Sequence, residues 1–290
     1  MNPLIAALLG LVEGVTEYLP VSSTGHLILA GHMLGQTGEA VDSFDIVIQL
    51  GAILAVLVHY RRLLADRTAG LFRRERASMQ LLLALVLGFA PTAIAGLLLR
   101  KKIKALLFGP GPVAAALVVG GIVMIAIELL RARTSVKPTA TSHDGGYRDA
   151  ASPDGAVAGG GLVGLEHVTP LRALLIGLGQ CVSMWPGSSR SMCTIVAGQL
   201  TGLSTATAAV FSFLLGLPTL GAATVYEAYK SHEVLGEIGG LNIAIGLVVS
   251  FVVAWAVIAA FLAYLKRRGL VPFGIYRIIL GLVVFVLFVR

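Results

Sequence analysis

Charged residues are scarce in this sequence. Asp, Glu, Lys and Arg together make up 13% of its 290 residues, whereas hydrophobic residues make up 57%. The apolar residues come in long blocks and do not alternate with polar ones, which argues against half-buried β-strands. Composition and pattern together predict an all-α integral membrane protein with several spanning helices.

Cysteines and nucleotide motifs are also nearly lacking. The only two cysteines, Cys181 and Cys193, lie in a hydrophobic region and match no metal-ligand spacing, so we expect both to be small core residues without redox chemistry. Neither a Walker loop nor a Rossmann fingerprint occurs, so the sequence gives no support for nucleotide hydrolysis. The N-terminal stretch "MNPLIAALLGLVEG" lacks a basic region and a cleavage site, and we expect it to be kept as a helix.

The net charge of +7 does not indicate a nucleic-acid partner. The basic residues sit in short clusters between apolar blocks ("RRLLADR", "RRER", "RKKIK", "KRR"), which we expect to be loop anchors. The positive-inside rule of membrane proteins accounts for such clusters. We therefore expect a bilayer as the partner, and no nucleic acid.

Six apolar blocks are long enough to cross a bilayer, which takes about 20 residues. They are residues 44–60, 79–99, 113–130, 206–226, 241–265 and 272–289. Two shorter blocks, 27–35 and 193–200, each follow a proline and a serine-rich turn, "LPVSSTGH" and "WPGSSRS". A short helix after such a turn is typical of a segment that enters the membrane and returns on the same side. The sequence thus predicts six transmembrane helices plus two re-entrant helix-loop-helix hairpins, 3–35 and 171–200.

The two halves of the chain resemble each other. An offset of 167 positions maps "GLVEGVTEY" onto "GLGQCVSMW", "LAGHMLG" onto "VAGQLTG", and Phe44 onto Phe211. Between the halves, residues 134–169 are polar and Gly-rich and are predicted to be a linker. We predict a first repeat at 1–133 and a second at 170–290, each with one hairpin and three spans. Because three is odd, the second repeat must be inverted relative to the first.

Orientation follows from the distribution of basic residues. Most of them fall on the side that the chain reaches after its first span, and the positive-inside rule makes that side cytoplasmic. Both termini and the mouth of the first hairpin are therefore predicted to face away from the cytoplasm.

The first hairpin carries costly polar groups within "EGVTEYLPVSSTGH". Glu13 and Glu17 are one helical turn apart and share a face, so the pair is suited to hold a hard divalent cation such as Mg²⁺ or Ca²⁺. Solvated acids at an interfacial helix end are the alternative. After Pro20, the hydroxyls of Ser22, Ser23 and Thr24 can cap the returning helix or bind an anion at its start. His26 can transfer a proton or attack phosphorus.

The second hairpin carries a cation instead of acids. Arg190 lies in "PGSSRS" and can clamp a phosphate with its guanidinium, while Gly187, Ser188, Ser189 and Ser191 offer a flexible turn and hydroxyls to the substrate. The alternative is that Arg190 only pairs with Glu13 or Glu17 across the repeat.

Three other polar residues are less decisive. Asp45 and Gln49 lie a turn apart near the start of a span, where they line the same cavity or sit at the interface. Arg277 lies inside the last apolar block and either braces the site or extends its side chain to the membrane surface.

These motifs, with the flanking "FDIVIQLGAILAV" and "FSFLLGLP", resemble the undecaprenyl-diphosphate phosphatase family of the bacitracin-resistance type over all but the linker. The resemblance implies an inner-membrane enzyme that removes the terminal phosphate of a C55 polyprenyl diphosphate and regenerates the monophosphate carrier for envelope glycans. It also implies a divalent cation. Glu13 and Glu17 match the family's acidic motif, Ser23, Thr24 and His26 its serine-histidine segment, and Arg190 the arginine of its second motif.

One departure from the family pattern is Met192, where a glycine is usual, and its bulk could alter the packing of the loop. The sequence leaves Ser23, His26 and an activated water open as the attacking group, and it leaves a homodimer open. A polyprenyl-phosphate flippase or secondary transporter with the same anion site is the alternative function.

Overall fold

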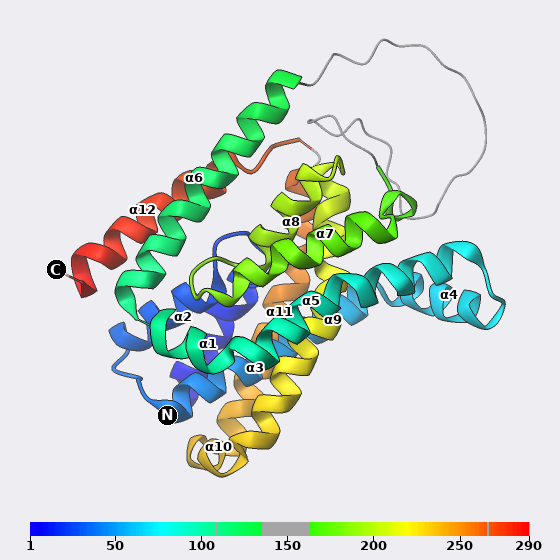
Figure 1. Cartoon of the computed structure of the whole chain (residues 1–290). Coiled ribbons are helices and arrows are strands. Elements are labelled where there is room, and N and C mark those ends of the chain that lie inside the picture. The colour runs from blue at the N-terminus through cyan, green and yellow to red at the C-terminus, as the bar shows by residue number, and fades with distance from the viewer. Residues whose placement is uncertain (108, 135–162, 266, 290) are drawn as a thin grey trace.

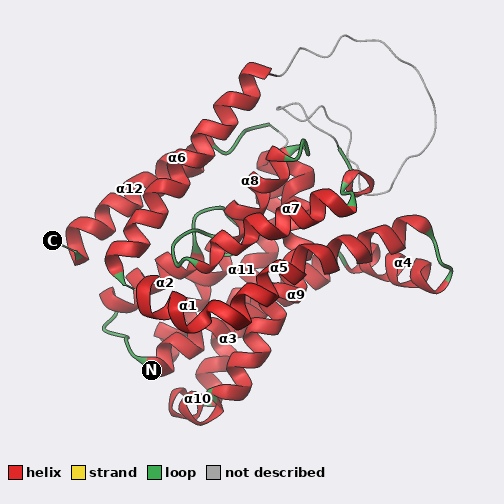
Figure 2. Cartoon of the chain, viewed as in Figure 1, coloured by secondary structure: helices red, strands yellow, loops and turns green. Residues whose placement is uncertain are grey.

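Every regular element of the described chain is a helix (Figures 1 and 2). The computed structural model describes residues 1–107, 109–134, 163–265 and 267–289. The all-α prediction is confirmed for these residues. The predicted linker at 134–169 falls mostly outside them.

Two helix-loop-helix pairs begin the two halves of the chain. In the first half the helices are α1 (Pro3–Thr16), α2 (Ser23–Met33), α3 (Glu39–His59), α4 (Arg61–Phe72), α5 (Arg76–Leu107) and α6 (Pro110–Thr134). In the second half they are η1 (Leu165–His167), α7 (Pro170–Gln180), η2 (Cys181–Met184), α8 (Arg190–Leu200), α9 (Thr205–Lys230), α10 (His232–Ile238), α11 (Gly240–Leu265) and α12 (Val271–Phe288).

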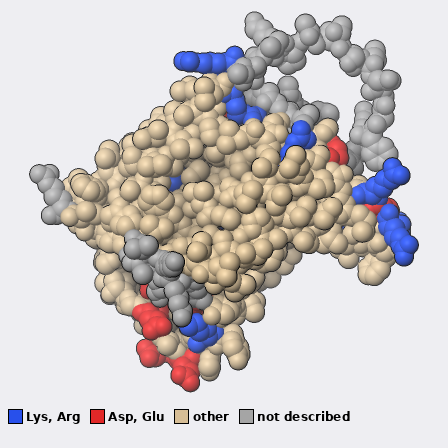
Figure 3. All heavy atoms as spheres, viewed as in Figure 1, with Lys and Arg blue, Asp and Glu red and all other residues tan. Residues whose placement is uncertain are grey.

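Six of these helices are long and apolar enough to cross a membrane, as the sequence predicted: α3, α5, α6, α9, α11 and α12. Large apolar side chains such as Leu97, Val248 and Leu282 point out of the protein, where a bilayer would cover them. Figure 3 shows charged side chains gathered toward the ends of the molecule, with a largely uncharged band between them. The protein is a multi-pass membrane protein.

The basic cluster that begins at Arg61 was expected in a loop, and this prediction was wrong. Residues 61–72 form α4, which packs against α3 and α5 and projects sideways with the start of α5 (Figure 1). The segment is rich in Leu, Ala and Arg, has no proline, and so favours a helix. Likewise "RKKIK" continues α5 instead of following it.

Glycines let the short helices pack closely on long ones. α1 lies along α11, where a Cβ on Gly10 would come within 2.6 Å of the carbonyl oxygen of Gly246. α7 lies along α5 in the same way, with Gly177 against the backbone of Gly88. Gly10 and Gly177 are related by the predicted offset. Small residues at such crossings are typical of helix packing in membranes.

The centre of the molecule is built by α3 and α9, while α6 and α12 run side by side along one flank (Figure 1). Phe44 of α3 and Phe211 of α9, which the offset also relates, are fully buried. Tyr18, in the first hairpin loop, packs edge-on against Phe213 with ring centroids 5.0 Å apart. The loop between α1 and α2 therefore lies inside the protein, against α9.

Candidate active site

The first hairpin turns sharply between α1 and α2. Glu17 caps α1, its backbone N–H donating to the carbonyl of Glu13 at 3.0 Å, and the chain then turns through Pro20. Ser22 has φ +74°, and its Oγ caps α2 by accepting from the N–H of Gly25 at 3.3 Å. A left-handed φ is uncommon for a residue other than glycine and is found at functional turns.

The second hairpin turns in the same way. Ser189 has φ +71°, and its Oγ caps α8 by accepting from the N–H of Met192 at 3.3 Å. Ser22 and Ser189 are equivalent under the predicted offset of 167. The same strained cap therefore occurs at the same place in both hairpins.

The two loops are bonded to each other. Ser191 Oγ donates to the carbonyl of Leu19 at 2.9 Å. Arg277 reaches from α12 to both loops, donating to the carbonyl of Pro20 at 3.3 Å and to that of Gly187 at 2.9 Å. This guanidinium is fully buried, so it braces the loops and does not extend to the membrane surface.

Glu17 connects the two hairpins, because it contacts predicted site residues of both. Its Oε1 accepts from Arg190 Nη2 at 2.9 Å, and its Oε2 accepts from Ser23 Oγ at 2.6 Å. All three side chains are buried or nearly so. The structure thus brings together one acid and one hydroxyl of the first hairpin with the cation of the second.

Arg190 is held in place by further contacts, to residues that the sequence did not predict for the site. Nη1 donates to the carbonyl of Ser212 at 2.7 Å and to its Oγ at 3.2 Å, and that Oγ is 2.6 Å from Thr194 Oγ1. The guanidinium carbon lies 5.7 Å from the centroid of the Tyr18 ring, within cation–π range. The offset could have found Ser212, because it is the counterpart of Asp45.

Glu13 is buried differently from Glu17. Its side chain is 0% exposed, and neither carboxylate oxygen has a hydrogen-bond partner among the described residues. Its counterpart in the second half, Gln180, is equally buried but donates to Thr92 Oγ1 at 2.9 Å. A buried carboxylate without a partner needs either a proton or a cation.

His26 does not point toward Glu17 or Arg190. Its Nδ1 lies 2.7 Å from the carbonyl oxygen of Ser22, and its Nε2 lies 2.7 Å from Tyr276 Oη. Both ring nitrogens are therefore engaged within the protein. Thr24, the next predicted residue, is exposed at the start of α2.

The predicted binding hydroxyls of the second hairpin are largely occupied by the loop itself. Ser189 Oγ caps α8 and lies 3.0 Å from Ser191 Oγ, which in turn bonds the first loop. Ser188 is buried, and its N–H donates to the carbonyl of Trp185. Gly187 has φ +94°, and a Cβ there would meet the backbone of Val113 at 2.7 Å.

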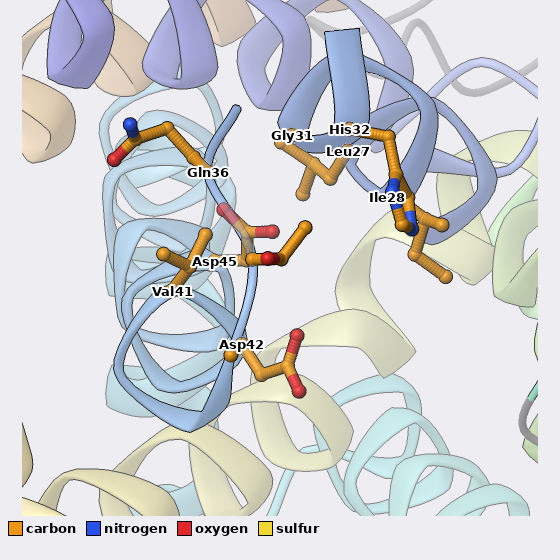
Figure 4. Close-up of a pocket in the computed structure, with 10 residues that line it drawn as sticks. Leu27, Ile28, Gly31, His32, Gln36, Val41, Asp42 and Asp45 are labelled. Carbon is orange, nitrogen blue, oxygen red and sulfur yellow. The ribbon is translucent and has the colours of Figure 1, made fainter. Parts of the chain in front are cut away.

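A cavity of about 150 Å³ lies between α2 and α3 (Figure 4). Asp45 points into it from α3, opposite Leu27 and Ile28 of α2, and its Oδ1 has no hydrogen-bond partner in the described chain. Asp45 thus lines a cavity, whereas Gln49 is not among the lining residues.

Met192 packs in the core beside the second loop. It lies in the first turn of α8, is 5% exposed, and packs with its methyl group against Gly120 of α6. The absent side chain at Gly120 leaves the room that the extra bulk requires. The extra bulk of Met192 therefore fills space in the core beside Arg277.

The donor set suits a divalent cation only in part. Oxygen ligands are what Mg²⁺ and Ca²⁺ prefer, and the two orphaned oxygens of Glu13 fit that requirement. Within the described residues, however, no group of three or more acidic, His or Cys side chains comes together. A cation here would need phosphate oxygens or water to complete its shell.

Comparison with known proteins identifies the family of the chain. The family model described as bacitracin resistance protein BacA matches residues 6–283. A Sorangium cellulosum protein named undecaprenyl-diphosphatase is 54% identical over 281 residues, which is 96% of this chain and 84% of the relative. A protein of the same name from Deinococcus radiodurans is 42% identical over 294 residues, which is 100% of this chain and 97% of the relative. The chain therefore belongs to the BacA family of bacitracin resistance proteins.

Proposed function

We propose that this protein hydrolyses undecaprenyl diphosphate to the monophosphate and inorganic phosphate, as the names of its relatives indicate for them. The observation that carries the proposal is the position of Glu17, bonded at once to a hydroxyl of its own hairpin and to the arginine of the other. A nucleophile, a base beside it and a third group that orients the base are the mark of covalent catalysis.

In this mechanism Ser23 Oγ attacks the terminal phosphorus and gives its proton to Glu17. The bond from that phosphorus to the bridging oxygen breaks, and undecaprenyl phosphate leaves. Water then attacks the phosphoserine, the bond from phosphorus to Ser23 Oγ breaks, and Glu17 returns its proton to Oγ, so that phosphate leaves and Ser23 and Glu17 are restored. Arg190 binds the phosphoryl oxygens as charge develops on them, exchanging part of its contact with Glu17 for the substrate. The 2.6 Å contact favours Ser23 over His26, whose ring nitrogens are both engaged.

Glu13, with Glu17 beside it, is where a divalent cation would bind. Such a cation would neutralise diphosphate charge and polarise the phosphoryl group. The fully buried, unpartnered carboxylate of Glu13 supports this assignment.

We also propose that both helix pairs are re-entrant and that the halves are inverted repeats. α1 has 14 residues and α2, α7 and α8 have 11 each. At 1.5 Å per residue such helices reach only about 16–21 Å, short of a hydrocarbon core of about 30 Å. The matched caps at Ser22 and Ser189 and the matched glycine crossings of α1 and α7 support a duplication.

The proposed placement is the bacterial inner membrane, with both termini and the mouth of the first hairpin facing away from the cytoplasm. This orientation rests on the positive-inside rule. The polyprenyl tail would lie along the protein beside the bilayer, and the diphosphate would enter between the hairpins. A homodimer remains a prediction.

The test is phosphate release from undecaprenyl diphosphate by purified protein in detergent, with and without a chelator. We expect metal-dependent release that Ser23→Ala abolishes. The matched control is Ser250→Ala, which removes a buried hydroxyl from α11 that has no hydrogen-bond partner in the described chain. Tight lipid binding without phosphate release would favour a flippase, and Ser23→Ala with normal release would overturn the proposed nucleophile.

A further inference from the structure

The last helix, α12, is fixed against both hairpin loops. Arg277, fully buried on α12, donates to the carbonyls of Pro20 and Gly187 in the loops and to that of Ala116 in α6 at 3.1 Å. Gly120 and Gly121 of α6 give α12 room to approach, since a Cβ on either would collide with it. The residues beside Arg277 therefore have a defined position relative to the site.

Tyr276, the residue before Arg277 on α12, forms a hydrogen bond with His26. Tyr276 Oη lies 2.7 Å from His26 Nε2. The two rings are nearly parallel, with an interplanar angle of 5° and centroids 5.6 Å apart. Residues 250 positions apart in the chain thus form one hydrogen-bonded pair.

The partners of His26 decide its tautomer. The carbonyl oxygen of Ser22 can only accept a hydrogen bond, so the proton must be on Nδ1. In the neutral ring Nε2 is then the acceptor, and the Tyr276 hydroxyl is the donor. His26 therefore connects α12 to the turn at Ser22 through two hydrogen bonds, one from Tyr276 and one to the Ser22 carbonyl.

That turn sets the direction of Ser23. Ser22 has φ +74°, and its carbonyl accepts two hydrogen bonds from His26, from the backbone N–H at 3.3 Å and from the ring. The equivalent Ser189 accepts the backbone bond from Cys193 at 3.0 Å, and a cysteine has no ring to add the second. Only the hairpin that carries Ser23 has this additional support.

We propose that Tyr276 is a positioning residue for phosphate release. By donating to Nε2 it holds His26 in the Nδ1–H form, His26 holds the carbonyl of Ser22, and Ser23 stays directed at Glu17. The inference rests on the proposed phosphatase function. It assigns His26 to the support of Ser23 and places neither ring on the substrate.

The kinetic test uses Tyr276→Phe, which keeps the ring and removes the hydroxyl. Tyr264→Phe is the matched control, because it removes a tyrosine hydroxyl at the end of α11 that donates to the carbonyl of Gly269 in the following loop. With undecaprenyl diphosphate in detergent, we expect Tyr276→Phe to lower kcat about fivefold with KM little changed, the effect of one neutral hydrogen bond. Combining it with His26→Ala should give no further loss beyond His26→Ala alone.

The spectroscopic test is ¹⁵N NMR of histidine-labelled protein, with His26→Gln to assign the signals. Wild-type protein should show His26 protonated on Nδ1, and Tyr276→Phe should shift its Nε2 signal while Tyr264→Phe does not. Protonation on Nε2 in the wild type overturns the inference without any variant, as does normal kcat or a raised KM alone in Tyr276→Phe. A wild-type protein that shows the predicted signals but releases no phosphate would instead contradict the proposed function.

Discussion

Replacing Arg277 by Met should separate the two hairpin loops and destabilise the whole protein. Met fills a similar volume without charge or donors. It would leave three backbone carbonyls, those of Pro20, Ala116 and Gly187, without their guanidinium partner in a fully buried place. Hydrogen bonds from a charged donor contribute about 1.5–3 kcal/mol each, and an unsatisfied buried acceptor costs about 1–3 kcal/mol.

These losses are offset in part, because the variant no longer buries a charge. We expect a net loss of about 3–5 kcal/mol in the free energy of unfolding. For a chain of this size that corresponds to a fall in melting temperature of about 6–10 °C. The melting temperature of Arg277→Lys should lie between those of the wild type and Arg277→Met, since one ammonium cannot reach all three carbonyls in the same geometry.

Thermal unfolding in detergent, followed by tryptophan fluorescence, measures the change. Arg172→Met is the matched control: Arg172 also donates to two backbone carbonyls, those of Thr201 and His167, but is half-buried and remote from the loops. Arg172→Met should lower the free energy of unfolding by about 1 kcal/mol. Equal melting temperatures for Arg277→Met and the wild type would refute the assignment of Arg277 as the brace between the hairpins.

The remaining predictions concern charge, packing and the family departure. Glu17→Gln should lower phosphate release about 100-fold or more, because it removes the base beside Ser23 and the ionic partner of Arg190, whereas Glu237→Gln, at an exposed position of α10, should leave release unchanged. Gly10→Ala should reduce the yield of folded protein, since its Cβ meets the Gly246 carbonyl at 2.6 Å, while Gly96→Ala, with nothing within 4 Å, should stabilise α5 by about 1 kcal/mol. Met192→Gly should lower the melting temperature by leaving a void beside Gly120 and Arg277; an unchanged melting temperature would show that the site collapses without loss.

Local patterns allowed much of the fold to be predicted. Block lengths located the six long apolar helices, and the Pro and Ser-rich turns located the two helix-loop-helix pairs. The segment at α4 was missed, because a basic stretch between two apolar blocks is compatible with both a loop and an interfacial helix. What distinguishes a helix from a loop here is the packing of this segment against α3 and α5, which the local sequence does not show.

The sequence determined which residues the candidate site contains wherever their chemistry was conspicuous. Glu13, Glu17, Ser23 and Arg190 are costly in an apolar chain, and helical spacing alone places the two acids on one face. It could not determine which acid pairs with Arg190, because periodicity fixes neighbours within a helix and says nothing about distances between helices.

Only the tertiary structure decided how these groups are used. It places Arg190 and Ser23 on Glu17 and leaves Glu13 without a partner among the described residues. It also brings α12, at the far end of the chain, against His26 and both hairpin loops. The physical reason is that the packing of helices, which is a property of the whole chain, decides which partners a buried polar group can reach.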